Sequence, residues 1–181
     1  MSCSAGATPS GCSRGGAVPV ILARIDDRLI HGQVTVAWGG WLEPDRMVLV
    51  NDEVATTEWR RELYAEADSL GAAVSVMTKA EFLEAASAGR WASQRVIVIV
   101  ETPADMRDLI EGGFRPETVN VGGMHFSPGK REILSYVYVD DVDVEAMQKI
   151  IEEGVELTAQ DVPQSQPVDM ARMLSDASST D

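Results

Sequence analysis

Residues 23–34 read ARIDDRLIHGQV. The apolar run at residues 18–23 is typical of a buried strand, and residues 32–41 have the pattern of a short helix. His31 therefore lies between the carboxyl end of a strand and the amino end of a helix, close to Arg24 and Arg28. A helix start favours an anion, and a neutral imidazole can act as a nucleophile. The segment therefore predicts a site at which a histidine can carry a phosphoryl group.

Apolar runs alternate with helical patterns along the rest of the chain. The predicted strands are, in order, residues 18–23, 46–50, 73–77, 95–100, 118–121, 135–139 and 155–160. The predicted helices after the first begin at Thr56, Thr78, Thr102 and Asp140. This alternation predicts an α/β fold, namely a three-layer, open, twisted and mostly parallel sheet of about six or seven strands with helices on both faces.

The chain is expected to hold one folded domain between two tails. Residues 1–17 are rich in Ser and Gly and predict a disordered tail, and residues 18–163 hold the whole α/β domain. Residues 164–181 predict a loose tail in which residues 168–174 can form one helical turn. The Gly122-Gly123 pair predicts a turn.

Apolar side chains on the predicted helix at residues 56–69 fall on one face. Trp59, Leu63 and Ala67 recur at helical spacing, which predicts that they pack inward. The other tryptophans, at positions 38, 41 and 91, are likewise expected to be buried at least in part.

Composition excludes several classes of protein. The formal net charge is −14 over 181 residues, which argues against a nucleic-acid partner and against direct docking on an anionic membrane. No apolar run reaches the roughly 18–20 residues of a membrane-spanning helix, and the amino end lacks a secretory signal pattern. Cys3 and Cys12 are the only cysteines, so no disulfide framework or CxxC metal site is expected. These features predict a cytoplasmic protein that meets a membrane only through a partner.

The ends of the predicted strands locate the chemistry. In an open α/β sheet, ligands bind beyond the carboxyl ends of the strands. Among these segments only residues 24–31 combine a nucleophile with cations, while Gly122 and Gly123 would allow backbone N–H groups to approach a phosphate. The chain has no Walker, dinucleotide, HExxH or GxSxG motif.

Each of these features also has a purely structural interpretation. His31 alone is more often a capping residue than a nucleophile, and Arg24 and Arg28 can pair with the neighbouring aspartates. The two glycines can form an ordinary turn, and His125 is expected to be a solvated loop residue near the rim of the site.

The segment at residues 23–34 closely resembles the active loop of enzyme IIB subunits of the mannose/fructose/sorbose family. These subunits belong to the bacterial phosphoenolpyruvate-dependent sugar phosphotransferase system. Residues 48–55, 120–124, 154–157 and 161–163 are also similar to segments of that family, in the expected order. The resemblance covers about residues 18–163.

The resemblance implies a role for each matching residue. His31 would accept a phosphoryl group, on Nδ1, from the phosphohistidine of a IIA protein and pass it to sugar held by the membrane IIC/IID permease. Arg28 would bind the phosphoryl oxygens. The further phosphate-binding candidates are Arg24, Gly32, Gln33, Gly122 and Gly123. From proximity, Asp26 or Asp27 is expected to orient the imidazole. No metal or cofactor is required, because arginines and amides can neutralise the phosphate.

The expected activity is that of a protein-N-phosphohistidine–sugar phosphotransferase, IIB component. The protein would be cytoplasmic and peripherally associated with the permease. Two alternatives stay open: a regulatory phosphoprotein of an incomplete phosphotransferase system, and a phosphate-binding interaction module whose histidine is never phosphorylated.

Overall fold

The computed structural model describes residues 20–67 and 71–177. The strands are β1 (Val20–Asp26), β2 (Arg46–Val50), β3 (Ala73–Met77), β4 (Val96–Val100), β5 (Thr118–Gly123), β6 (Arg131–Leu134), β7 (Val137–Val139), β8 (Glu156–Ala159) and β9 (Val168–Asp169). The helices are the π-helix η1 (Gln33–Gly39), α1 (Gly40–Leu42), α2 (Asp52–Thr56), α3 (Glu58–Ala65), α4 (Lys79–Ser87), α5 (Pro103–Glu111), α6 (Asp141–Glu152) and α7 (Met170–Ala177). The predicted tail at residues 1–17 lies outside the described residues.

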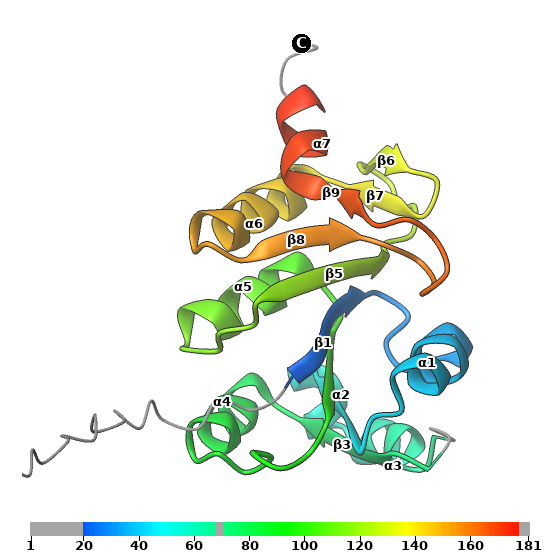
Figure 1. Ribbon diagram of the computed structural model, residues 1–181, viewed down its shortest axis with the longest axis vertical. Coiled ribbons are helices and arrows are strands. Elements are labelled where there is room, and N and C mark those ends of the chain that lie inside the picture. The colour runs from blue at the N-terminus through cyan, green and yellow to red at the C-terminus, as the bar shows by residue number, and fades with distance from the viewer. Residues whose placement is uncertain (1–19, 68–70, 178–181) are drawn as a thin grey trace, which may run out of the picture.

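Seven strands form one sheet in the order β3-β2-β4-β1-β5-β8-β9 (Figure 1). The strands from β3 to β8 pair in parallel, and β9 alone is antiparallel, on β8. The predicted open, mostly parallel sheet is therefore confirmed. Because β1 lies between β4 and β5, the loop after β1 opens beside the carboxyl ends of both neighbours.

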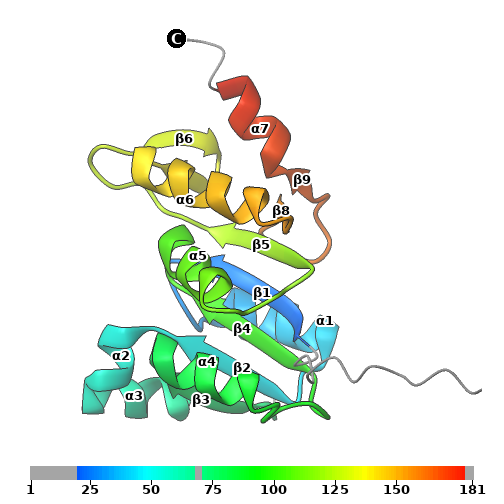
Figure 2. The same ribbon diagram turned by 90° about the vertical axis from the view of Figure 1, so that its left-hand side faces the viewer.

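Helices cover both faces of the sheet. Successive side chains of a strand point to opposite faces. Residues 48 and 50 of β2 belong to a core cluster with side chains of α4, α5 and α6, whereas residues 47 and 49 belong to a second cluster with η1 and α2. Figure 2 shows α4, α5 and α6 along one face, with α1 behind the sheet. Every residue of β4 is fully buried, as expected of a strand covered on both sides.

The predicted helix at residues 56–69 is wrong in its start and in its buried face. Asn51 accepts a hydrogen bond from Val54 N (2.9 Å), so a helix begins directly after β2. The extended backbone at Thr57 then separates α2 from α3. Trp59 and Leu63, predicted to pack inward, are 66% and 62% exposed, whereas Ala67, predicted on the same face, packs partly buried against the second core cluster together with Tyr64. Trp41, also predicted to be at least partly buried, is 66% exposed.

The carboxyl-terminal segment is more ordered than predicted. Residues 164–181 were expected to form a loose tail, but β9 pairs with β8 and α7 follows it. Met170 and Leu174 of α7 are buried, at 0% and 3% exposure, because their four-residue spacing places both on the inner face of the helix.

Two short elements before α6 also differ from the sequence prediction. The Gly122-Gly123 pair was predicted as a turn but forms the end of β5. The segment at residues 131–139 forms the antiparallel β6–β7 pair, where only one strand was predicted. No helix in the described part of the chain is long and apolar enough to cross a membrane.

Candidate active site

His31 lies in the loop between β1 and η1, at the carboxyl edge of the sheet. Its side chain is 19% exposed. The ring places Nδ1 2.9 Å from the carbonyl oxygen of Leu29 and Nε2 3.4 Å from Oε1 of Gln33. Leu29 has a positive φ of 57°, which turns its carbonyl into the loop. The backbone N–H and hydroxyl of Thr35 both donate to the His31 carbonyl, at 2.9 and 3.2 Å. The imidazole is therefore held in place while part of it stays accessible.

Arg28 lies beside this imidazole and is the more accessible of the two predicted arginines. Its side chain is 43% exposed. The guanidinium donates through Nη2 to Oε1 of Gln33, which is also the oxygen nearest Nε2 of His31. The structure thus brings Arg28, His31 and Gln33 together at the surface.

Asp26 connects these surface residues to the interior. Its side chain is fully buried. Oδ1 accepts a hydrogen bond from Arg28 N (3.2 Å) and lies 3.8 Å from both Arg28 Nε and His31 Nδ1. Oδ2 accepts from Nε and Nη2 of Arg24, at 3.2 and 2.9 Å. One carboxylate therefore contacts the loop with one oxygen and a buried cation with the other.

Arg24 is fully buried among protein acceptors. Besides Asp26, its guanidinium donates to Oδ1 of Asn120 and to the carbonyl oxygens of Gln160 (3.1 Å) and Asp161 (3.2 Å). The guanidinium carbon lies 5.3 Å from the centre of the Trp38 ring.

This environment differs from the one that phosphate binding requires. Burial lowers the pKa of the Arg24 guanidinium, although the nearby Asp26 carboxylate opposes that effect. Because Arg24 has no exposed surface and its donors face protein oxygens, it is not placed to contact an external phosphate in this structure. Its geometry fits a different task, which is to fix the carboxylate of Asp26.

The two glycines of β5 have different surroundings. A Cβ atom built on Gly122 would lie 1.8 Å from Cζ of Arg24, so Gly122 makes room for the buried arginine. At Gly123 the same atom would lie 3.5 Å from Oδ1 of Asp26 and 3.7 Å from Nη2 of Arg28. Gly123 therefore lines the site, whereas Gly122 lies against the guanidinium behind it. Gly32, directly after His31, is exposed, and nothing lies within 4 Å of a Cβ built there.

Asp27 contacts the loop that follows β5. Its carboxylate accepts hydrogen bonds from the backbone N–H of His125 and from Nδ1 of that ring, the latter at 2.6 Å. Of the two aspartates expected to orient His31, Asp26 is thus the one that approaches its ring. His125 is 52% exposed and borders the site, since its Cε1 would lie 3.6 Å from a Cβ on Gly123.

Sequence reasoning gave no role to Asn120, Trp38 or the backbone at residues 160–161. A signal for Asn120 was present. Arg24 and Asn120 are polar residues inside two otherwise apolar strands, and they are direct register partners in β1 and β5. Two polar side chains at one level of a buried sheet must satisfy each other.

The arrangement combines an imidazole with a planar guanidinium at an accessible loop. A guanidinium can form paired hydrogen bonds with phosphoryl oxygens, and an imidazole nitrogen can form a bond to phosphorus. The site therefore contains the kinds of group that phosphoryl transfer requires.

Comparisons with known proteins agree with this chemistry. Residues 20–181 match the family described as "PTS system sorbose subfamily IIB component". The chain is 39% identical over 149 residues to the N-acetylgalactosamine-specific phosphotransferase enzyme IIB component 1 of Escherichia coli (strain K12), covering 81% of this chain and 93% of that protein. It is 32% identical over 155 residues to the PTS system fructose-specific EIIB component of Bacillus subtilis (strain 168), covering 86% and 95% of the two chains.

Another relative is longer than this chain. The PTS system mannose-specific EIIAB component of Escherichia coli (strain K12) is 36% identical over 154 residues, which are 85% of this chain. The match covers 48% of the EIIAB protein, so this chain spans about half the length of that relative.

A solved structure has the same fold. The IIBSor domain of the sorbose permease from Klebsiella pneumoniae superposes with a TM-score of 0.81 at 30% identity, over 87% of this chain and 96% of that domain. Together with the family match, this shows that the chain belongs to the sorbose subfamily of IIB components of the phosphotransferase system, which are phosphotransferases.

Proposed function

We propose that this chain is a phosphocarrier that accepts a phosphoryl group on His31 from the phosphohistidine of a IIA protein. It then passes the group to a sugar bound by the membrane IIC/IID permease during uptake. The observation that carries the proposal is the cluster at the β1–η1 loop, where Asp26 contacts both His31 and Arg28. Membership in the IIB family supports the same activity.

The transfer step involves two nitrogen–phosphorus bonds. The bond in the donor phosphohistidine breaks as a bond from phosphorus to a His31 nitrogen forms, and the donor nitrogen keeps the electron pair. Arg28 is well placed to bind the phosphoryl oxygens, and the backbone amides at Gly32 and Gln33 add further donors. Gly123 allows the loop to approach the group closely. No metal is needed for this step, because the guanidinium and amides balance the charge.

The hydrogen bonds of His31 bear on which nitrogen reacts. A neutral imidazole has one N–H, and donation from Nδ1 to the Leu29 carbonyl leaves the lone pair on Nε2. Phosphorylation of Nδ1, which we propose on family grounds, therefore requires that this hydrogen bond be released and that the ring proton move from Nδ1 to Nε2. A rotation of the ring about the Cβ–Cγ bond releases the hydrogen bond, and exchange of the proton with water gives the tautomer with its lone pair on Nδ1.

IIB domains of the phosphotransferase system act together with IIA and IIC permease components. We accordingly propose a cytoplasmic location with peripheral attachment to the permease. An exposed loop at the edge of the sheet offers a small contact area. Small interfaces are typical of transient complexes, so the loop suits brief contact with two partners in turn.

A reconstitution tests the proposed function. The protein is incubated with phosphoenolpyruvate, the general carrier proteins and a cognate IIA, and is then mixed with vesicles that contain the permease and sugar. The phosphoryl group, followed as a label, is expected to appear on the protein and then on the sugar. Stable label that never reaches sugar would instead support a regulatory phosphoprotein. If the protein takes up no label, it is a phosphate-binding module at most.

A further inference from the structure

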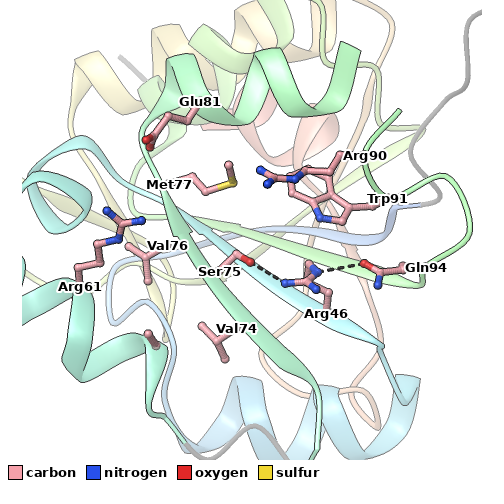
Figure 3. A pocket seen from close by; sticks show the side chains of 11 residues that line it. Arg46, Arg61, Val74, Ser75, Val76, Met77, Glu81, Arg90, Trp91 and Gln94 are labelled. Carbon is pink, nitrogen blue, oxygen red and sulfur yellow. Dashed lines mark hydrogen bonds between the residues drawn. The ribbon is translucent and has the colours of Figure 1, made fainter. Parts of the chain in front are cut away.

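A cavity lies along β3, the edge strand of the sheet, between α3 and α4 (Figure 3). Its volume is about 520 Å³, within the roughly 300–1,000 Å³ typical of small-molecule pockets. Side chains of β2, α3, β3, α4 and the loop after α4 line it. Strands β2 and β4 separate β3 from β1, so the strand that carries the His31 loop is three strand spacings away, about 14 Å. The cavity is therefore distinct from the site at His31.

Three arginines line this cavity. Arg46, Arg61 and Arg90 face a single lining carboxylate, that of Glu81. Among the residues that the structure describes, no carboxylate oxygen lies within the 4.0 Å of an ion pair from any of these three guanidiniums. The whole chain has 29 acidic and 15 basic residues, so three arginines around the single lining carboxylate of Glu81 are a local exception to its charge. Like charges around a recess repel each other, and a bound anion relieves that repulsion.

Arg46 is held in position by neutral partners. Its Nε donates to Oε1 of Gln94 (3.0 Å) and its Nη1 donates to Oγ of Ser75 (2.7 Å). These acceptors fix the direction of the guanidinium but carry no charge to balance it. A guanidinium has five N–H groups, so Arg46 retains donors beyond these two bonds. A fixed, half-buried cation of this kind is preorganised to bind an anion.

The other polar groups of the cavity suit hydroxyl groups. Because Oε1 of Gln94 is occupied by Arg46, its amide N–H groups remain as donors. Oε2 of Glu81 accepts from the backbone N–H and the hydroxyl of Thr78, at 2.8 and 3.1 Å, which fixes the carboxylate at the start of α4. Figure 3 shows Glu81 at one end of the cavity and Arg46 with Gln94 at the other. Arg61 lies on the side of Glu81, whereas Arg46 and Arg90 lie toward Gln94 and Trp91. Two cations away from Glu81 and a hydroxyl acceptor beside Arg61 define a ligand with two unlike parts.

We propose that this cavity binds a small phosphomonoester that also carries hydroxyl groups, a molecule of the sugar phosphate class. The guanidiniums of Arg46 and Arg90 bind its phosphate, and Glu81, Ser75 and Gln94 bind its hydroxyls. Inorganic phosphate fills only part of the volume and makes no use of Glu81. An acidic peptide strand is less suitable, because α3 and α4 flank the edge of β3 on both sides.

Calorimetric titration of the full chain tests this proposal. The probes are the 6-phosphates of glucose, mannose and galactose, the three unmodified sugars, inorganic phosphate and an acidic peptide. At least one sugar phosphate is expected to bind more tightly than inorganic phosphate, and the unmodified sugars are expected not to bind. Arg90→Gln should weaken binding about tenfold, which corresponds to about 1.4 kcal/mol.

Two arginines that lie outside the cavity serve as matched controls. Arg60 neighbours Arg61 on α3 and pairs with Glu53, and Arg95 donates to the carbonyl oxygen of Leu42. Arg60→Gln and Arg95→Gln should bind the sugar phosphate as the parent does, and so should His31→Gln, because this titration involves no phosphoryl transfer.

Several results would overturn the assignment. These are no binding of any sugar phosphate, equal binding of inorganic phosphate, tighter binding of the peptide, or an equal loss in the Arg60 and Arg90 variants. None of them bears on phosphorylation of His31, so the two proposals can fail separately.

Discussion

The guanidinium of Arg24 occupies the space in which a side chain at position 122 would begin. A Cβ atom on Gly122 would lie 1.8 Å from Cζ and 1.9 Å from Nη2 of Arg24. Any residue other than glycine at position 122 would therefore push the arginine away from Asp26 and Asn120. The fit between these two residues links the strand pairing of the sheet to the position of the carboxylate beside His31.

Gly122→Ala is expected to lower the free energy of unfolding by about 3 kcal/mol or more. Overpacking of a core costs about 1–3 kcal/mol, and displacement of a buried ion pair adds to it. Gly123→Ala is the control for stability, because its Cβ would meet ordinary contact distances of 3.5 Å or more. Denaturant unfolding measures both variants. Equal stability of the two would show that Arg24 does not need the space at Gly122.

Arg24→Met is expected to destabilise the protein by about 3–5 kcal/mol, because it leaves the buried carboxylate of Asp26 without its cation. The double variant Arg24→Met, Asp26→Leu should recover part of this loss, since it removes both charges. Unfolding of the parent, both single variants and the double variant gives the coupling energy. Additive effects would mean that the two charges do not depend on each other.

Arg28→Lys is expected to slow phosphoryl transfer to His31 about 10–100-fold with little change in stability. An ammonium cannot reproduce the planar fork of a guanidinium, and Arg28 is 43% exposed, so packing changes little. The rate of label uptake from a phosphorylated IIA measures the effect. Arg60→Lys, on α3, controls for a general effect of replacing a surface arginine by lysine. Transfer at the parent rate in Arg28→Lys would remove Arg28 from the phosphate site.

Asp161 predicts a pH dependence of stability. A hydrogen bond from the Ser165 hydroxyl, with smaller effects from the Val162 N–H and Arg24, lowers the pKa of its carboxyl below the usual value. Because the pKa is lower in the folded state, the ionised carboxylate stabilises the fold at pH values above the unfolded pKa of about 3.9. This stabilisation is lost as the pH falls through the pKa of the folded state. Asp161→Asn should therefore be less stable than the parent at pH 7, and the gap should narrow below about pH 4. A gap that stays constant from pH 7 to pH 3 would contradict this.

The outcome for Arg24 and for α3 shows what a sequence can and cannot predict. The strand at residues 95–100 and the helix start at Thr78 are local signals, and both appear as predicted. The burial of Arg24 depends on β5 and on the carbonyls at residues 160–161, more than 130 positions away in the chain. No local pattern encodes that distance, so the arginine was expected to bind phosphate.

The exposed face of α3 has a similar cause. Periodicity correctly groups Trp59 with Leu63, but it does not say which direction the stripe faces. That direction depends on tertiary packing, in which Tyr64 and Ala67 contact the second core cluster. The same limit applies to α7, whose buried side chains are recognisable only once β8 and α6 are in place.

The nitrogen of His31 that carries phosphate can be identified by nuclear magnetic resonance. Nitrogen-15-labelled protein is phosphorylated, and the coupling of phosphorus to each ring nitrogen is measured. We expect the phosphoryl group on Nδ1, with the hydrogen bond to the Leu29 carbonyl lost. Coupling to Nε2 would show instead that the ring reacts in the orientation of the free protein, with Nδ1 still 2.9 Å from that carbonyl.

Mass spectrometry of the phosphorylated protein tests the central claim most directly. The protein is incubated with phosphoenolpyruvate, the general carrier proteins and IIA, digested at alkaline pH, and the modified residue is located by fragmentation. One phosphoryl group is expected on His31 in the parent and in His125→Gln, and none in His31→Gln, with the fold unchanged in all three. Phosphate on any other residue, or undiminished labelling of His31→Gln, would contradict the account.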